Sequence, residues 1–317
     1  MRCAAPILAI LIASTAQTDA ALAWGTSGQR LVSLVAARSL PLDVPSFIKT
    51  AEAARQIGEV AREPDRAARA DTDPVHFVLV ADDLKIARGP SLSALPASRE
   101  DYDTALRAVG SNEYRAGYLP YTIIDAWQQL TMDFAYWRAD IAALKYVKTP
   151  SEQTSYFRDQ HIREGLTIRD LGILSHFVTD GSEPLRVTVR ADKALLARLQ
   201  SVVARSHIGE SNVSVRLPPY RDCQCTIMQR VSAYLTATQK QLGPLTRLEN
   251  SNAFDDNHEN GKAFVEERLA AASAELRDLI AEAWRASGEL SIGRPPVALR
   301  DIESGKIDAL GPLLGTD

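Results

Sequence analysis

Two side chains able to bind a metal ion, His176 and Asp180, stand four residues apart in the chain. On a helix, residues i and i+4 lie on one face, so this imidazole and this carboxylate would point at the same volume. That is the spacing that two ligands on one helix need in order to bind one zinc ion. Taken alone, the pair fits an ordinary surface contact better than a metal site, so it needs partners from elsewhere.

Two further side chains of the same kinds occur earlier in the sequence. Asp65 follows Pro64 in a charge-rich stretch, residues 62–74, that we expect to be a loop. His76 begins an apolar run that ends at Val80 and has the character of a short strand. A carboxylate and an imidazole on irregular backbone beside a buried segment suit metal binding, although each is weak evidence by itself.

The amino-terminal 23 residues have the pattern of a secretory signal peptide. Arg2 gives a positive start, an uncharged apolar core follows, and small residues at Ala21 and Ala23 mark a cleavage site. We therefore expect a periplasmic or secreted protein whose mature domain spans residues 24–317 and begins at Trp24. The free α-amine and the carbonyl of one residue can chelate a metal through a five-membered ring; alternatively, Trp24 is a core residue that merely follows the cut.

Composition excludes some classes of protein and leaves others open. A net charge of -4 gives no general attraction for nucleic acid, so polyphosphate binding would need a local basic patch or metal ions. After the signal no apolar run reaches the roughly 20 residues of a membrane span, and we expect no integral membrane segment. Cys223 and Cys225, at i and i+2, allow a strained bridge at best. We prefer a structural or incidental role for them over a redox site.

Hydrophobic periodicity predicts helices along almost the whole mature chain. The sequence shows no internal repeat and no linker long enough to divide it, so we expect one all-α domain. We also expect a monomer. The helices are expected at residues 24–40, 45–60, 121–147, 151–180, 192–206, 225–241 and 264–286.

In combination, these residues resemble a known family. An amino-terminal Trp-Gly, an Asp in a loop, a His-Phe soon after it and a helical His-Phe-x-x-Asp followed by Glu-Pro-Leu resemble the S1/P1 nucleases; the zinc-dependent phospholipase C family shares their fold and ligand order. The resemblance implies a secreted, helical hydrolase of phosphodiester bonds with up to three zinc ions. It also implies one zinc site made of four residues, with Asp180 bridging to a second zinc at Trp24. The four residues are Asp65, His76, His176 and Asp180.

The sequence departs from the family pattern at three places. Gln29 stands where the family has a histidine five residues after the tryptophan, and a neutral amide is a poor zinc ligand. Arg186 replaces a second histidine, six residues after the helical aspartate. The nearest candidates for a third-zinc pair, His207 and Glu210, are one residue too close together. We therefore expect about one tightly held zinc ion.

These features predict a zinc-dependent phosphodiester hydrolase of the S1/P1 nuclease type in which Asp65 and Arg186 take part in catalysis. A guanidinium binds phosphate oxygens in bidentate fashion, so Arg186 could replace a lost zinc as an electrophile; a salt bridge to Glu183 or Asp180 is the alternative. The substrate would be nucleic acid or a small phosphodiester. A non-catalytic relative that binds a phosphate-bearing ligand or partner, and a phospholipase C-like esterase, remain as alternative functions.

Overall fold

The computed structural model describes residues 24–67, 73–190, 192–255 and 258–314. The predicted signal peptide, residues 1–23, lies outside the described residues. Within them the protein is all-α, with one two-stranded antiparallel sheet. None of the described helices is both long enough and apolar enough to cross a membrane.

The described elements follow one another from Gly25 to Leu314. In chain order they are α1 (Gly25–Arg38), η1 (Ser46–Lys49), α2 (Ala51–Val60), α3 (Glu63–Ala67), η2 (Pro74–His76), α4 (Arg99–Arg107), α5 (Glu113–Ala116), α6 (Leu119–Ala143), α7 (Pro150–Gly181), η3 (Pro184–Arg186), α8 (Lys193–Arg205), α9 (Glu210–Ser214), α10 (Ile227–Gln239), α11 (Leu242–Asn250), α12 (Glu259–Ser287), β1 (Ser291–Ile292), β2 (Val297–Ala298), α13 (Leu299–Glu303) and α14 (Leu310–Leu314).

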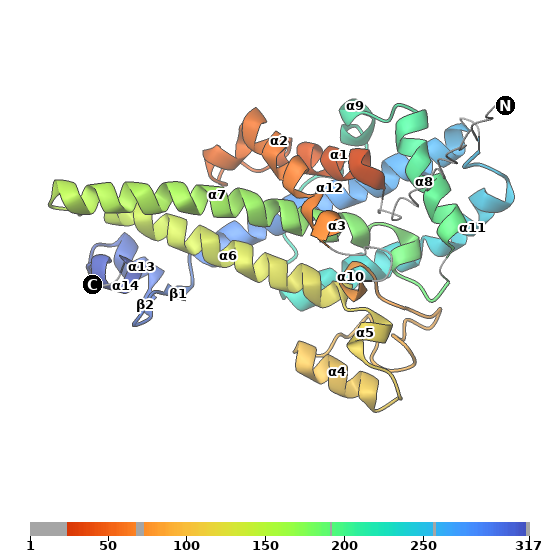
Figure 1. The fold of residues 1–317 in the computed structure, drawn as a ribbon, viewed down its shortest axis with the longest axis horizontal. Helices are drawn as coiled ribbons and strands as arrows, with labels where there is room; N and C mark the ends of the chain where they lie inside the picture. The colour runs from red at the N-terminus through yellow and green to blue at the C-terminus, as the bar shows by residue number, and fades with distance from the viewer. Residues whose placement is uncertain (1–23, 68–72, 191, 256–257, 315–317) are drawn as a thin grey trace, which may run out of the picture.

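Three long helices, α6, α7 and α12, form the frame of the molecule. Helices α6 and α7 pack against each other as an antiparallel hairpin, and α1, α2 and α12 pack against this pair (Figure 1). The start of α7 is set by its sequence: the Thr149 side chain accepts a hydrogen bond from the Glu152 amide (3.2 Å), and the Glu152 carboxylate accepts one from the Thr149 amide (3.1 Å). Pro150 occupies the first helical position, where its missing N–H costs nothing.

Apolar side chains form two separate clusters. The larger one joins α1, α2, α6, α7, α8, α10 and α12, and it includes the loop residues Val78 and Val80. The smaller one lies where the tip of the α6–α7 hairpin meets the carboxyl-terminal segment, and it contains Ala139, Tyr156 and Ile302. The candidate metal ligands lie on α3, on η2 and on the end of α7 opposite the hairpin tip.

The seven predicted helices are confirmed, with one divided into η1 and α2. The loop predicted over residues 62–74 is wrong for Glu63–Ala67, which forms α3, and residues 68–72 of that prediction lie outside the described residues. The expected strand character of the run ending at Val80 is also wrong. Two of its amides instead donate to the ends of short helices: Val78 N–H to the Arg186 carbonyl of η3 (2.8 Å) and Leu79 N–H to the Ala116 carbonyl of α5 (2.7 Å). Burial, rather than a sheet, explains its apolar residues.

Candidate metal centre

The carboxyl-terminal part of α7 places His176 and Asp180 in the interior. Their side chains are 0% and 1% exposed, and His176 Nε2 lies 3.2 Å from Asp180 Oδ2. The surrounding turns of α7 are buried on every side between Leu174 and Gly181, because α1, α2, α6 and α12 all contact this helix. The helical spacing therefore brings the two groups together, and it does so in the core rather than at the surface.

His76 reaches the same point from η2. Its Nδ1 lies 2.8 Å from Asp180 Oδ2 and 3.0 Å from His176 Nε2. Asp73, whose side chain accepts a hydrogen bond from the Val75 amide (3.2 Å), fixes the start of this short helix. Helix η2 thus places His76 beside an aspartate that lies 104 residues later in the chain.

Asp65 completes the group from α3. Its Oδ1 lies 3.8 Å from His176 Nε2, and its side chain is 9% exposed, more than the other three. Asp65, His76 and His176 each offer a ligand atom within 4.8 Å of the others, so this group could hold a metal ion. Asp65 is the member at the edge that faces outward.

The separations between these atoms match those expected around one ion. A tetrahedral zinc with bonds of about 2.0–2.1 Å holds its ligand atoms roughly 3.3 Å apart. Four of the six separations among His76 Nδ1, His176 Nε2, Asp180 Oδ2 and Asp65 Oδ1 run from 2.8 to 3.8 Å. The group in which every ligand atom lies within 4.8 Å of the others is Asp65, His76 and His176. The donor set of two imidazoles and two carboxylates suits zinc, and the residues present therefore fit the predicted ion.

A hydrogen bond outside the group orients His176. Its Nδ1 lies 2.7 Å from the carbonyl oxygen of Ala61, at the end of α2. If Nδ1 carries the proton and donates to this carbonyl, Nε2 is left as the lone-pair atom that faces Asp65, His76 and Asp180. Metal-binding histidines are commonly held in this way.

The electrostatics of the group favour a cation. Burial opposes charge on His176, but the carboxylates of Asp180 and Asp65 outweigh burial and raise the pKa of His176. Burial would likewise raise the pKa of Asp180, yet His176 and His76 outweigh it and hold that pKa well below its usual range. Burial raises the pKa of Asp65. A positive charge at this point is therefore stabilised mainly by an ionised Asp180.

Trp24 lies beside the same end of α7. It is fully buried and directly precedes α1, and its indole Nε1–H donates to Ser182 Oγ (2.7 Å), two residues beyond Asp180. Asp180 Oδ1 is buried and has no hydrogen-bond partner among the described residues, whereas Oδ2 faces the histidines. A carboxylate with one oxygen on the ion and the other directed elsewhere can bridge two cations. The α-amine that would hold the second requires cleavage after Ala23, outside the described residues.

Gln29 and Arg186, which depart from the family pattern, are both buried. Neither Gln29 Oε1 nor Nε2 has a hydrogen-bond partner within the part of the chain that the structure describes. Arg186 ends η3, and its charge acts on two carboxyls: burial raises the pKa of Asp65 and raises that of Glu183 to about 7, and Arg186 opposes both shifts. Arg186 therefore lies close enough to the candidate centre to affect it.

His207 and Glu210 lie apart from this group. His207 is exposed, in left-handed backbone (φ 48°) between α8 and α9. Glu210 begins α9 and forms an ion pair with Arg38, the last residue of α1. Trp24 precedes the first residue of that 14-residue helix, so about 20 Å of helix separates Trp24 from the Arg38 end. Among the described residues, neither His207 nor Glu210 joins a group of three ligand atoms.

Sequence reasoning missed Glu183 as a member of the buried polar set. Its Oε1 accepts a hydrogen bond from the Leu185 amide (3.0 Å), and Oε2 is buried with no partner among the residues described. The only signal was its place in the Glu-Pro-Leu run after Asp180.

Comparisons with protein-family models, with curated proteins and with solved structures found no match.

Proposed function

We propose that this protein is a zinc-dependent hydrolase of phosphodiester bonds. The observation that carries the proposal is a buried group in which Asp65, His76 and His176 each offer a ligand atom within 4.8 Å of the others. Asp180 Oδ2 joins it at 2.8 Å from His76 Nδ1 and 3.2 Å from His176 Nε2. Two imidazoles and two carboxylates at this spacing are typical of a zinc site. When bound with an open position, zinc supplies Lewis acidity and makes water a nucleophile at neutral pH.

The position of each residue of the candidate centre indicates its role in this function. Asp180 and the two histidines, which are almost wholly buried, hold and orient the centre, since packing leaves them little freedom to move. Asp65, the most exposed of the four, lies where a substrate would approach. Arg186 carries a fixed positive charge that acts on Asp65, and a guanidinium beside the centre can bind phosphate oxygens and stabilise the charge that develops on them.

Burial supports a second candidate function. If all four side chains bind one zinc, the ion has no open position and is structural. The low exposure of His76, His176 and Asp180 favours this arrangement. The protein would then be a non-catalytic relative that binds a phosphate-bearing ligand or partner. The greater exposure of Asp65 (9%) than of the other three side chains and the charge of Arg186 favour the hydrolase, because a purely structural zinc needs neither.

One experiment tests both candidates. The chain would be purified without chelator, its zinc measured by elemental analysis, and its turnover measured on single-stranded DNA, RNA, a chromogenic phosphodiester and a phospholipid. We expect about one zinc per chain and hydrolysis of at least one substrate. Arg186→Ala should keep the zinc and lower turnover on the order of 100-fold, the usual effect of losing one charge-stabilising group.

The matched control is Arg190→Ala, because Arg190 is exposed and pairs with Asp82. It should change neither zinc content nor turnover. Zinc without hydrolysis of any substrate would favour the structural alternative, and absence of zinc would overturn both candidates. Hydrolysis that survives Arg186→Ala but is lost in Asp65→Ala would keep the enzyme and remove the arginine from its mechanism.

A further inference from the structure

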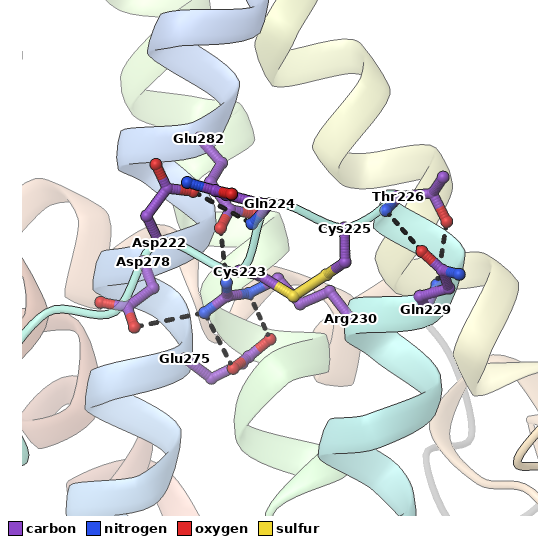
Figure 2. The surroundings of a disulfide bond; sticks show 10 residues. All are labelled: Asp222, Cys223, Gln224, Cys225, Thr226, Gln229, Arg230, Glu275, Asp278 and Glu282. Atoms are coloured by element: carbon purple, nitrogen blue, oxygen red, sulfur yellow. Dashed lines mark hydrogen bonds and ion pairs between the residues drawn. A yellow bond between two sulfur atoms is a disulfide. The ribbon is translucent and has the colours of Figure 1, made fainter.

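A second chemically active feature lies away from the metal centre, in the segment between α9 and α10. The structure joins Cys223 and Cys225 in a disulfide whose Cα atoms are 5.1 Å apart, within the usual range for such bonds (Figure 2). Cys223 and the intervening Gln224 are exposed, and Cys225 is partly exposed. Both sulfurs therefore belong to a surface segment that thiols in solution can approach.

This disulfide contributes little to holding the fold. Disulfides that close the shortest loops constrain the unfolded chain least, and this one spans a sequence separation of two. Other contacts tie the segment to α12. Arg277 donates to the Pro218 carbonyl (2.8 Å), and Arg285 bonds to the Tyr220 hydroxyl. These contacts do not use the sulfur atoms, so the segment can stay docked when the bridge is open.

The backbone inside the ring is strained in the disulfide form. Gln224 has φ 49°, in the left-handed region that side-chain-bearing residues rarely adopt. Its amide donates to Asp222 Oδ1 (3.2 Å), which stabilises this tight turn. Opening the ring would free Gln224 to relax to an ordinary conformation, which favours the dithiol.

The two sulfurs have different electrostatic surroundings. Cys223 follows Asp222. Burial raises the pKa of the nearby Glu282 carboxyl and the Cys223 backbone lowers it, so negative charges lie on the side of Cys223. Cys225 directly precedes Thr226, the amino-terminal cap of α10, and the positive end of a helix favours a thiolate.

The nearby cation does not reverse this difference. The Arg230 guanidinium on α10 is bound by the carboxylates of Glu275, Asp278 and Glu282 (Figure 2). Its charge is therefore already compensated, and Cys225 is the better leaving group of the two.

We propose that Cys223 and Cys225 form a reversible dithiol–disulfide couple that exchanges with thiols. A thiolate attacks Cys223 Sγ, the bond between the cysteines breaks, and its electron pair leaves on Cys225 Sγ. A second thiolate attacks the sulfur now attached to Cys223 and releases the Cys223 thiolate. Two thiols become one disulfide, the couple gains two electrons, and the protons of the two thiols end on Cys223 and Cys225.

The native protein provides the first test. It would be equilibrated in mixtures of reduced and oxidised glutathione, quenched in acid, alkylated and weighed by mass spectrometry, with the helical circular dichroism followed in parallel. We expect conversion to the doubly alkylated form as the mixture becomes more reducing, with an unchanged helical signal. A disulfide that resists every mixture until denaturant is added, or that opens only as the helices melt, would overturn the proposal.

A second experiment distinguishes protein thiols from small-molecule thiols as the exchange partner. Reduced, unfolded ribonuclease A replaces glutathione at equal thiol concentration. Faster opening by ribonuclease A would support exchange with protein thiols, and faster opening by glutathione would support exchange with small thiols. Failure of both probes would overturn the proposal.

Two pairs of measurements test the physical argument. Limited alkylation of the reduced protein should label Cys225 before Cys223, and the reverse order would overturn the assignment of the leaving group. Gln224→Gly removes the cost of the left-handed backbone, whereas Gln224→Ala keeps it. The glycine variant should favour the disulfide about fivefold more than the alanine variant. Equal equilibria for the two would remove backbone strain from the argument.

Discussion

Helix α7 buries carboxylates in two places, and the groups that face them differ. Near its carboxyl-terminal end, Asp180 faces His76 and His176, which hold its pKa well below the usual range. Farther toward the hairpin tip, α7 and α6 bring carboxylates against one another. Burial and the nearby Asp159 raise the pKa of Asp140 to about 8.

Asp133 repeats the behaviour of Asp140. Burial, with the neighbouring carboxyl of Asp170, raises the pKa of Asp133, and Arg163 at 4.0 Å opposes the shift only in part. Buried acidic groups on one helix pair thus reach opposite states. Beside imidazoles the buried carboxylate favours its charged form and can bind a cation; without them, burial and a second carboxylate favour the protonated form. Acidity alone does not mark a metal site, and the histidines are what distinguish the two regions.

The largest expected effect comes from removing a histidine at the metal end. His176→Ala should release the zinc and lower the free energy of unfolding by about 3 kcal/mol or more, because binding free energy at a folded site contributes to stability. Elemental analysis and thermal melting would measure both. His161→Ala is the matched control on the same helix, since His161 is 91% exposed. It should keep the metal and change stability by less than about 0.5 kcal/mol. Equal zinc loss in both variants would contradict the proposed centre.

A smaller change in stability, of the opposite sign, is expected nearer the hairpin tip, where Asp133 and Asp140 are buried; we call this region the carboxylate end. The pKa of Asp140 is raised in the folded protein, so its stabilising contribution is complete below pH 3.8 and is lost as pH rises through about 8. Asp140→Asn removes this loss, and we expect it to stabilise the protein at pH 9 by roughly 1–3 kcal/mol, with little effect at pH 4. Urea unfolding across this range would measure the change.

The control for Asp140 is Asp83→Asn, because Asp83 is exposed and its side chain accepts the Lys85 amide (3.0 Å), which an asparagine can also do. The free energy of unfolding of the Asp83→Asn variant should equal that of the wild type at every pH. If Asp140→Asn were as pH-dependent as the wild type, the carboxylate end would not hold the proton that we assign to it.

The sequence could predict part of this comparison. The shared helical face of His176 and Asp180 and the helix expected at residues 151–180 follow from local sequence, and both predictions are confirmed. The approach of Asp65 and His76 depends on how α3 and η2 pack against α7, and only the family resemblance suggested it. Burial of Gln29 likewise depends on which face of α1 the other helices cover.

The carboxylate end was harder to foresee. Asp133 and Asp140 are seven residues apart on α6, a spacing that places them on one helical face and is typical of a solvated surface. Nothing local shows that α7 covers that face and brings Asp159 and Asp170 against it. For His207 and Glu210 the sequence suggested a contact that the structure does not show. Their nearness in sequence suggested that they bind one metal ion, whereas Glu210 pairs with Arg38. Charged residues alone do not reveal which side of a helix is buried.

The smallest expected effect is the coupling between the two regions. Asp159 and His176 are separated by about 25 Å of helix at 1.5 Å per residue. The stability changes of His176→Ala and Asp140→Asn should therefore add in the double variant, with an interaction energy below about 0.5 kcal/mol. A comparison pair, His176→Ala with Asp65→Ala, should be strongly non-additive, because the second change costs little once the zinc is gone. Strong coupling in the first pair would mean that α7 transmits metal binding to its carboxylates, and the two regions would have to be treated as one.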